Sequence, residues 1–217
     1  MLNLIIKDFL IQKKAVVLAI FYILFFIIVF QSIGETMFAP AIIAFTYILV
    51  MGAFAYDDKN KADLMINSLP IRRVKVVMAK YVSIFVYLVI GTAAYIIIYN
   101  ITTMANIPLK VYPVTFEALV GAVLGVSLMN SIHFPLLFRI GYTKARIFNL
   151  GIFFAFFFGF PWLGKLAKAD NRFIAAVRDF SQYQSDAVIG LSILAVTLVI
   201  LLASYSLSIK FYKQRDF

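Results

Sequence analysis

The charged residues that could do chemistry in this chain gather in one loop, residues 57–81, which separates two long apolar segments. Its cations are Lys59, Lys61, Arg72, Arg73, Lys75 and Lys80. The chain as a whole is 64% hydrophobic, so a basic loop of this length belongs outside the lipid, and loops of this kind face the cytoplasm. The loop is therefore predicted to bind a cytoplasmic partner.

The other residue types do not indicate catalysis. The chain has no cysteine, so it has no disulfide, no thiolate nucleophile and no Cys-ligated metal. His133 is the only histidine, and no carboxylate lies near it in the sequence, which excludes a multi-histidine metal site. No Ser/His/Asp set is visible either. We expect no catalytic residue, no cofactor and no metal on this chain.

One segment has the glycine and lysine spacing of a phosphate loop, residues 159–166 (GFPWLGKL). Leu166 stands where a Ser or Thr hydroxyl would ligate magnesium, and Pro161 has no backbone N–H to donate. A phosphate loop also joins a strand to a helix, whereas this segment ends an apolar helix. We therefore predict no nucleotide site here.

The apolar segments must position these residues, and they predict an all-α integral membrane protein with a single domain, residues 1–217. A helix needs about 20 mostly apolar residues to cross the hydrocarbon core of a bilayer. Six segments meet this requirement, approximately residues 15–33, 37–56, 82–104, 114–138, 147–163 and 187–209. The period-two alternation of barrel strands is absent.

The distribution of Lys and Arg predicts that both termini are cytoplasmic. With six spans, most of the cations fall before the first span, in the 57–81 loop, after the fourth span and at the C-terminus. The other side holds only Lys110 and the cations within residues 165–178. This topology explains the net charge of +10 better than nucleic acid, because the cations do not form a continuous basic face.

Two further segments have the pattern of amphipathic helices. Residues 1–14 place Leu2, Ile5, Ile6, Phe9 and Leu10 on one face and Asn3, Lys7, Asp8 and Lys14 off it. This pattern predicts a helix that lies in the membrane interface on the cytoplasmic side. Residues 165–180 have a similar pattern and are predicted to rest on the outer leaflet.

Three polar residues inside the apolar segments leave two interpretations open. Asn130 and His133, near Pro135, could form helix-packing hydrogen bonds beside a proline kink, or could mark polar points on a transport path. Glu117 could couple transport to protons, or could be an interfacial carboxylate near a helix N-terminus. A GxxxG pattern at residues 121–125 could serve subunit contact or packing within the chain.

The 57–81 loop itself divides into smaller elements. Residues 62–67 could form a short helix, residues 68–70 interrupt it, and a second helix would begin near Ile71 and run into the third span. On that second helix Arg72, Arg73, Lys75 and Lys80 fall within one arc, opposite Ile71, Val74, Val77 and Met78. A basic arc of this kind can also serve simply to anchor the loop to anionic lipid.

The segment Asn67-Ser68-Leu69-Pro70-Ile71-Arg72-Arg73, followed by Lys80-Tyr81 at the start of a span, resembles the SLP-x-x-R…KY signature of small ABC-2-type exporter permeases. The Asp57-Asp58-Lys59 segment and the C-terminal residues 212–217 (YKQRDF) are similar to that family as well. The resemblance implies a multi-pass subunit of the bacterial cytoplasmic membrane, which dimerises and recruits cytoplasmic ABC ATPase subunits that bind the ATP and magnesium.

The resemblance also implies that the first cytoplasmic loop holds a coupling helix that docks on the ATPase. The residues assigned to this contact are Asp57, Asp58, Lys59, Ala62, Asp63, Leu64, Met65, Asn67, Ser68, Leu69, Pro70, Arg72 and Arg73. The expected function is export of a hydrophobic or amphipathic substrate. Two alternatives stay open: a secondary transporter that couples to protons through Glu117, and a non-transporting immunity or sensor subunit. The substrate and the choice between homodimer and heterodimer are open too.

Overall fold

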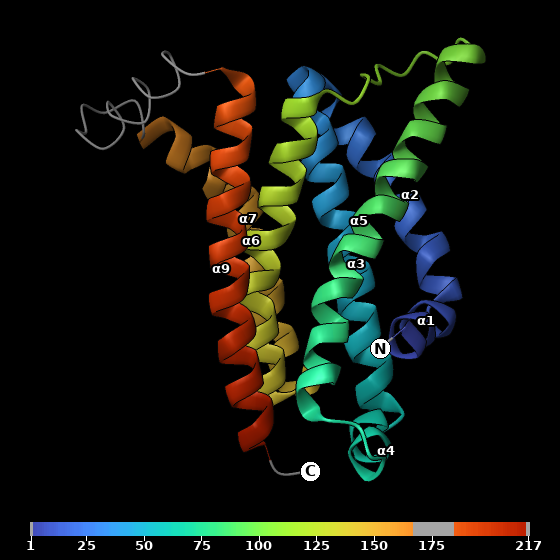
Figure 1. Cartoon of the computed structure of the whole chain (residues 1–217). Helices are drawn as coiled ribbons and strands as arrows, with labels where there is room; N and C mark the ends of the chain where they lie inside the picture. The colour runs from blue at the N-terminus through green and yellow to red at the C-terminus, as the bar shows by residue number, and fades with distance from the viewer. Residues whose placement is uncertain (1, 167–184, 216–217) are drawn as a thin grey trace.

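The computed structural model describes residues 2–166 and 185–215 (Figure 1), and these residues form helices and loops without a strand. This confirms the all-α prediction for the described part of the chain. The elements are α1 (Leu2–Ile11), α2 (Lys13–Phe30), the 3-10 helix η1 (Gln31–Met37), α3 (Phe38–Lys59), α4 (Ala62–Ser68), α5 (Arg73–Met104), α6 (Phe116–Ile140), α7 (Tyr142–Leu166) and α9 (Asp186–Gln214).

The long helices lie side by side and form one bundle, with the short helix α4 at one end (Figure 1). The end of α9 and the turn between α6 and α7 lie at this same end, which we call the α4 end. The loop from α5 to α6 lies at the opposite end. Helix α1 lies across the side of the bundle, nearer to the α4 end (Figure 1).

Local sequence explains where the helices break. Gly34 has φ 70° and ψ −143°, a conformation that side chains disfavour, and it interrupts the helical path between α2 and α3. Pro70 lies in the short break between α4 and α5, because its ring cannot continue a helix. Thr115 caps α6 by accepting a hydrogen bond from the backbone N–H of Ala118 at 3.3 Å.

Four helical stretches of the described residues are long and apolar enough to cross a membrane. They are Ala15–Lys59, Arg73–Met104, Phe116–Ile140 and Ala187–Gln214. The first stretch covers the first two predicted spans, which meet at the Gly34 break. The full count of six spans and the cytoplasmic side of the termini stay predictions. The predicted amphipathic helix at residues 165–180 lies almost entirely outside the described residues.

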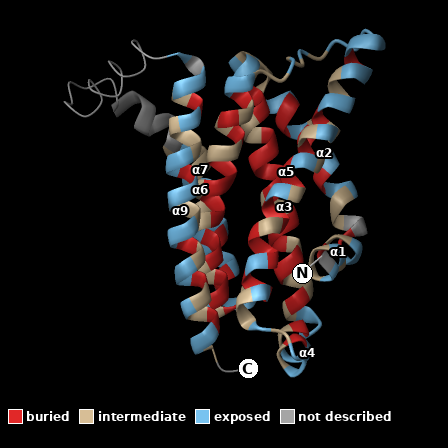
Figure 2. Ribbon diagram, in the orientation of Figure 1, coloured by how far each residue is buried: buried red, intermediate tan, exposed pale blue. Residues whose placement is uncertain are grey.

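The core lies between α3, α5 and α6, whose facing sides are buried (Figure 2). Aromatic rings fill much of it: Phe38 packs edge-on against Tyr95 at a centroid distance of 5.0 Å, and Tyr81 packs on Phe134 at 4.7 Å. Large apolar side chains on α2, α7 and α9 are exposed instead, which suits contact with lipid.

The GxxxG pattern serves packing within the chain at one of its two glycines. A Cβ at Gly125 would lie too close to Ile43 Cδ1 of α3, so glycine lets the Ile43 side chain pack against α6 without shifting. The space around Gly121 is open.

Candidate functional site

Helix α4 is a short helix that presents an apolar face to the outside. It confirms the short helix predicted for residues 62–67 and extends it by one residue. Ala62 and Ile66 are buried against the bundle, whereas Leu64 and Met65 are 49% and 67% exposed. Leu69, in the break that follows, is exposed as well. An exposed apolar face at the end of a bundle is typical of a protein contact.

The inner face of α4 is tied to the end of α9 by polar contacts. The Tyr212 hydroxyl donates to Asp63 Oδ1 at 3.4 Å and accepts from the Asn67 amide at 3.3 Å. Arg215 Nη1 lies 3.4 Å from Asp63 Oδ2. Burial raises the pKa of the Asp63 carboxyl, although Arg215 acts in the opposite direction. Helix α4 is therefore connected to the last helix of the chain.

Arg73 extends this connection to the start of α5. Its Nε donates to Asn67 Oδ1 at 3.1 Å, and its Nη1 donates to the backbone oxygen of Lys213 at 2.9 Å. The last carbonyls of a helix lack partners within the helix, so this guanidinium caps the end of α9. We call Asp63, Asn67, Arg73, Tyr212 and Arg215 the α4–α9 network.

A second cluster joins α1, α3 and α5 around a buried lysine. Lys80 Nζ lies 2.8 Å from Asp8 Oδ2 and 2.6 Å from Asp57 Oδ2. Lys7 Nζ, half-buried at the edge, lies 2.7 Å from Asp57 Oδ1 and 3.2 Å from Asp8 Oδ1. The Lys80 ammonium also lies 4.9 Å from the centroid of the Phe54 ring. We call Lys7, Asp8, Asp57 and Lys80 the Lys80 cluster.

The Lys80 cluster corrects one prediction. Lys80 does not share a basic surface with Arg72 and Lys75, because two carboxylates from other helices surround it in the interior. In helix α1, Ile6 and Leu10 are exposed, which is compatible with the predicted interfacial helix, whereas Asp8 is buried. The ion pairs account for this orientation, because a carboxylate in the interior is favourable only where a cation such as Lys80 pairs with it.

The other predicted residues of the loop lie at the surface around these networks. Asp58 accepts a hydrogen bond from the Thr143 hydroxyl, which joins the end of α3 to the start of α7. Lys59 is exposed in the last turn of α3, and Ser68 donates to the backbone oxygen of Met65 at 2.8 Å. Arg72 and Pro70 are exposed beside α4. The structure thus gathers the predicted loop residues at one end of the bundle.

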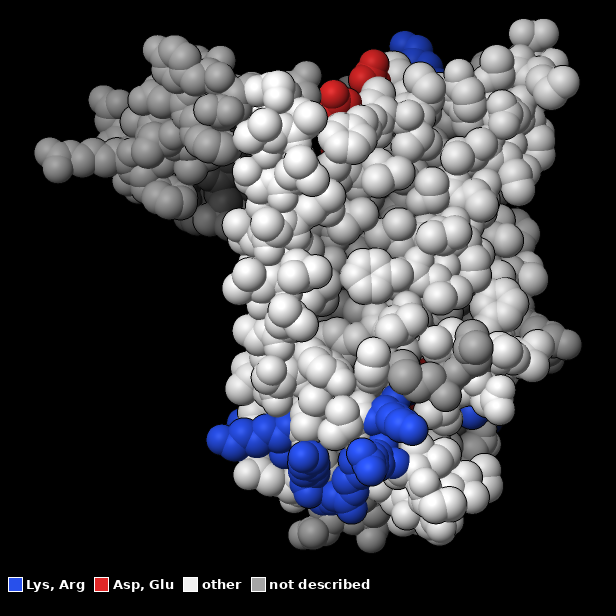
Figure 3. Space-filling view, in the orientation of Figure 1, with Lys and Arg blue, Asp and Glu red and all other residues white. Residues whose placement is uncertain are grey.

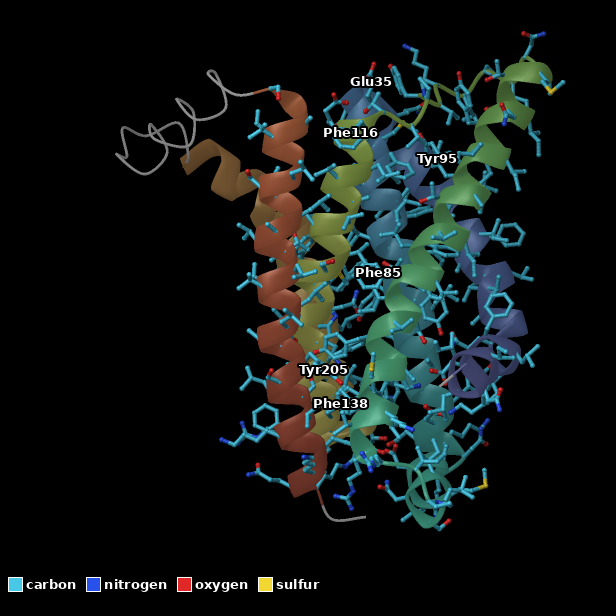
Figure 4. The ribbon with its side chains drawn as sticks, in the orientation of Figure 1. Glu35, Phe85, Tyr95, Phe116, Phe138 and Tyr205 are labelled. Atoms are coloured by element: carbon cyan, nitrogen blue, oxygen red, sulfur yellow. The ribbon has the colours of Figure 1, made fainter. Side chains whose placement is uncertain are left out.

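The structure does not bring Glu117 together with His133. Glu117 is exposed in the first turn of α6, at the end opposite α4, where Glu35 and Phe116 also lie (Figure 4). It lines a cavity of about 350 Å³ with Glu35. His133 is 16 residues further along the same helix, which corresponds to about 24 Å at 1.5 Å per residue. The two residues therefore do not form one site.

His133 lies in the interior with few polar partners. Its side chain is 0% exposed, its ring lies 5.4 Å from the Tyr47 ring, and the backbone of Asn149 lies close to it. Neither ring nitrogen has a hydrogen bond of good geometry. The Asn130 amide donates to the Val126 oxygen at 2.7 Å, but its carbonyl oxygen has no partner.

Sequence reasoning missed several residues of these sites. Asp8 is buried on α1, Gln12 is buried between α1 and α2, and Asn149 is buried on α7 with both amide atoms unpartnered. Ser204 and Ser208 on α9 hydrogen-bond the Tyr81 hydroxyl at 2.6 and 2.9 Å. A signal existed for the serines, because residues four apart share one helix face. For Asp8 the signal was a lone carboxylate in an apolar helix.

A comparison with models of protein families matches residues 3–213 to the family described as ABC-2 family transporter protein. Comparisons with curated proteins and with solved structures give no match. The matched range contains α1, the whole 57–81 loop and α9 up to Lys213, so it includes most of both polar networks. The match confirms the resemblance that the loop motif indicated. The chain belongs to the ABC-2 family of transporter proteins.

Proposed function

We propose that this chain is the permease subunit of an ATP-driven exporter, and that a separate cytoplasmic ATPase subunit binds and hydrolyses ATP. The family is a membrane transport component and is not itself catalytic. The observation that carries the proposal is α4, a short helix at one end of the bundle with Leu64 and Met65 exposed. An apolar helix face that inserts into a groove is a common mode of protein recognition.

The two polar networks offer a route from the ATPase contact to the spans. A displacement of α4 by the ATPase would act on α9 through Tyr212 and Arg215, and on α5 through Arg73. The Lys80 cluster then connects the start of α5 with α3 and α1. The helices that these two networks connect would move as a unit, because separating them would break the ion pairs and hydrogen bonds between them.

The orientation in the membrane follows from the position of the cations. On the face shown in Figure 3, the larger group of Lys and Arg lies at the α4 end, and a smaller basic group lies beside acidic atoms at the opposite end. The positive-inside rule places the α4 end in the cytoplasm. In this proposal α2, α3, α5, α6, α7 and α9 are the six spans, both termini are cytoplasmic, and the membrane is the bacterial cell membrane.

The apolar surfaces of the bundle favour a hydrophobic or amphipathic substrate and a second permease subunit beside this one. The family match does not favour a secondary transporter or a non-transporting immunity or sensor subunit. Glu117 lies on the surface at a helix N-terminus, where a carboxylate is favourable without any role in proton coupling.

The test is co-purification of the chain with its ATPase from native membranes in mild detergent. The double variant Leu64→Gln/Met65→Gln makes the α4 face polar, whereas the control Met78→Gln changes an exposed methionine on α5. We expect the double variant to lose most of the bound ATPase, by about tenfold or more, because buried apolar anchors dominate such contacts. The control should retain it. Equal recovery of the ATPase with the unmodified chain, the double variant and the control would refute α4 as the docking helix.

A further inference from the structure

A polar cavity of about 480 Å³ lies at the α4 end, beside the turn that joins α6 to α7. Arg139, near the end of α6, and Lys144, in the first turn of α7, line it from the two sides of the turn. Asp58, Thr143 and Arg215 complete its polar lining. The exposed apolar residues of α4 are not part of the lining, and Asp58 is the one residue that the cavity shares with the predicted ATPase contact.

The turn that shapes the cavity is held in place from both sides. Gly141 has φ 77°, and a Cβ there would lie 2.7 Å from Arg215 Nη2, so glycine permits both the turn and the close approach of Arg215. On the other side Thr143 donates to Asp58. These contacts fix the wall of the cavity before any ligand binds, which lowers the entropic cost of binding.

The cavity carries positive charge that the chain does not neutralise. In the described part of the chain, Lys7, Lys80 and Arg215 lie within ion-pair distance of carboxylates. Neither Arg139 nor Lys144 has such a partner among the described residues. Arg139 instead lies over the Phe211 ring at 5.3 Å. The Asp58 carboxylate contributes one negative charge to a lining that also holds Arg139, Lys144 and Arg215, so cations are in excess. Two cations at the rim of one cavity favour an anionic ligand, and a guanidinium suits phosphate.

An apolar surface begins directly beside these cations. Ile147 and Phe148 are 73% and 63% exposed, and they lie three and four residues after Lys144, on the same side of α7. The exposed apolar surface continues along α7 through Leu150, Phe154 and Phe158. A soluble phosphate would gain nothing from this surface, whereas the acyl chains of a lipid would cover it.

We propose that this cavity binds the phosphate of an anionic phospholipid in the membrane leaflet at the α4 end, with the acyl chains along α7. Arg139 and Lys144 bind the phosphate oxygens. Arg215, which lines the cavity and also lies beside Asp63, places the bound lipid next to the α4–α9 network. Lipid binding at this site does not require the ATPase. A negative result here would therefore leave the proposed function untouched, and a negative result there would leave the lipid site untouched.

The test is native mass spectrometry of the purified full-length chain, titrated with phosphatidylglycerol or with phosphatidylcholine. The variant is Arg139→Gln/Lys144→Gln, and the control Lys75→Gln/Arg146→Gln removes the same charge from exposed positions that do not line the cavity. We expect the variant to bind phosphatidylglycerol about 30-fold more weakly, since each cation near an anionic headgroup contributes roughly fivefold in affinity. The control should stay within about threefold of the unmodified chain.

Three results would overturn the proposal. Equal weakening in both double variants would show an effect of net charge alone. Equal binding of phosphatidylcholine would show that the anionic headgroup is not selected. Displacement of the lipid by millimolar inorganic phosphate would identify the site as one for free phosphate. All four positions lie on the surface, so the two double variants should unfold at the same temperature. Lys144→Arg should retain lipid binding, which would exclude a folding defect as the cause of the loss.

Discussion

Two groups of buried polar residues in this protein differ in whether they have partners. In the Lys80 cluster, each charged group has an opposite charge within 3.2 Å. Around His133 in the middle of the bundle, both amide atoms of Asn149 and the carbonyl oxygen of Asn130 have no hydrogen-bond partner, and the His133 ring has only the backbone of Asn149 close to it. A buried polar atom without a partner costs about 1–3 kcal/mol. Separating the first group would leave buried charges unpaired, whereas the second group already carries such a cost in this arrangement of helices.

For the proposed exporter, the difference predicts which part of the molecule stays rigid and which part changes during transport. A paired cluster between α1, α3 and α5 suits a unit that moves as one body. Unpartnered groups between α3, α6 and α7 would gain hydrogen bonds if these helices separated and admitted water or substrate. We expect the contact between α6 and α7 around His133 and Asn149 to line the transport path in another conformation.

The largest expected effect comes from removing the centre of the paired cluster. Lys80→Met leaves Asp8 and Asp57 buried without a cation, and this should lower the free energy of unfolding by about 3–5 kcal/mol. Lys75→Met, at an exposed position five residues earlier, should have little effect. Thermal unfolding of the purified chain in detergent measures both. The triple variant Asp8→Asn/Asp57→Asn/Lys80→Met should recover part of the loss, and no recovery would contradict the charge-pairing account.

A smaller effect is expected from Arg73, whose contacts hold α4 to the end of α9. Arg73→Gln removes the cap on the Lys213 carbonyl and should cost about 1.5–3 kcal/mol of stability, because hydrogen bonds from a charged donor are worth that much. ATPase binding should persist, since Leu64 and Met65 are unchanged. The steady-state ATPase turnover of the reconstituted complex should fall. If binding is lost instead, Arg73 belongs to the contact itself.

The unpartnered group should respond in the opposite direction. Asn149→Leu replaces an amide that lacks partners by an apolar side chain of similar size, so stability should rise by about 1 kcal/mol. The steady-state ATPase turnover of the complex should fall several-fold, because the path would lose a polar group. Ser204→Ala, which removes a serine with two hydrogen bonds, should lower stability instead. A loss of stability in Asn149→Leu would remove the contrast between the two groups.

The smallest effect is expected at Glu117. Glu117→Gln removes an exposed carboxylate from the first turn of α6, so stability should change by less than about 1 kcal/mol. ATPase turnover and its pH profile should be unchanged. Abolished transport in this variant would favour the proton-coupled alternative over the exporter.

The sequence predicted the helices better than the contacts between them. The apolar segments, the break at Gly34 and the short helix at α4 follow from local composition, and the structure contains them. The partner of Lys80 could not be predicted, because Asp8 lies 72 positions away and only the packing of α1 on α5 brings them together. The same limit applies to Asn149, whose neighbour His133 is on another helix.

The orientation of α1 shows why an amphipathic pattern alone can mislead. The pattern predicts a helix in the membrane interface, with Lys7 and Asp8 off its apolar face. In the structure the apolar Ile6 and Leu10 are exposed, as expected for contact with lipid, but Asp8 points into the protein and meets Lys80. Periodicity identifies two faces of a helix, and the charges of the neighbouring helices decide what each face meets.

The most direct test of the account is a crosslink from α4 to the ATPase. Since the chain has no cysteine, Met65→Cys introduces a single reactive thiol on the exposed face of α4, and Met78→Cys places one on α5 as the matched control. A short thiol-to-amine crosslinker in native membranes should join Met65→Cys, and not Met78→Cys, to a protein with a phosphate loop, identified by mass spectrometry. No ATPase crosslink from Met65→Cys, or equal crosslinking from both positions, would contradict the role assigned to α4.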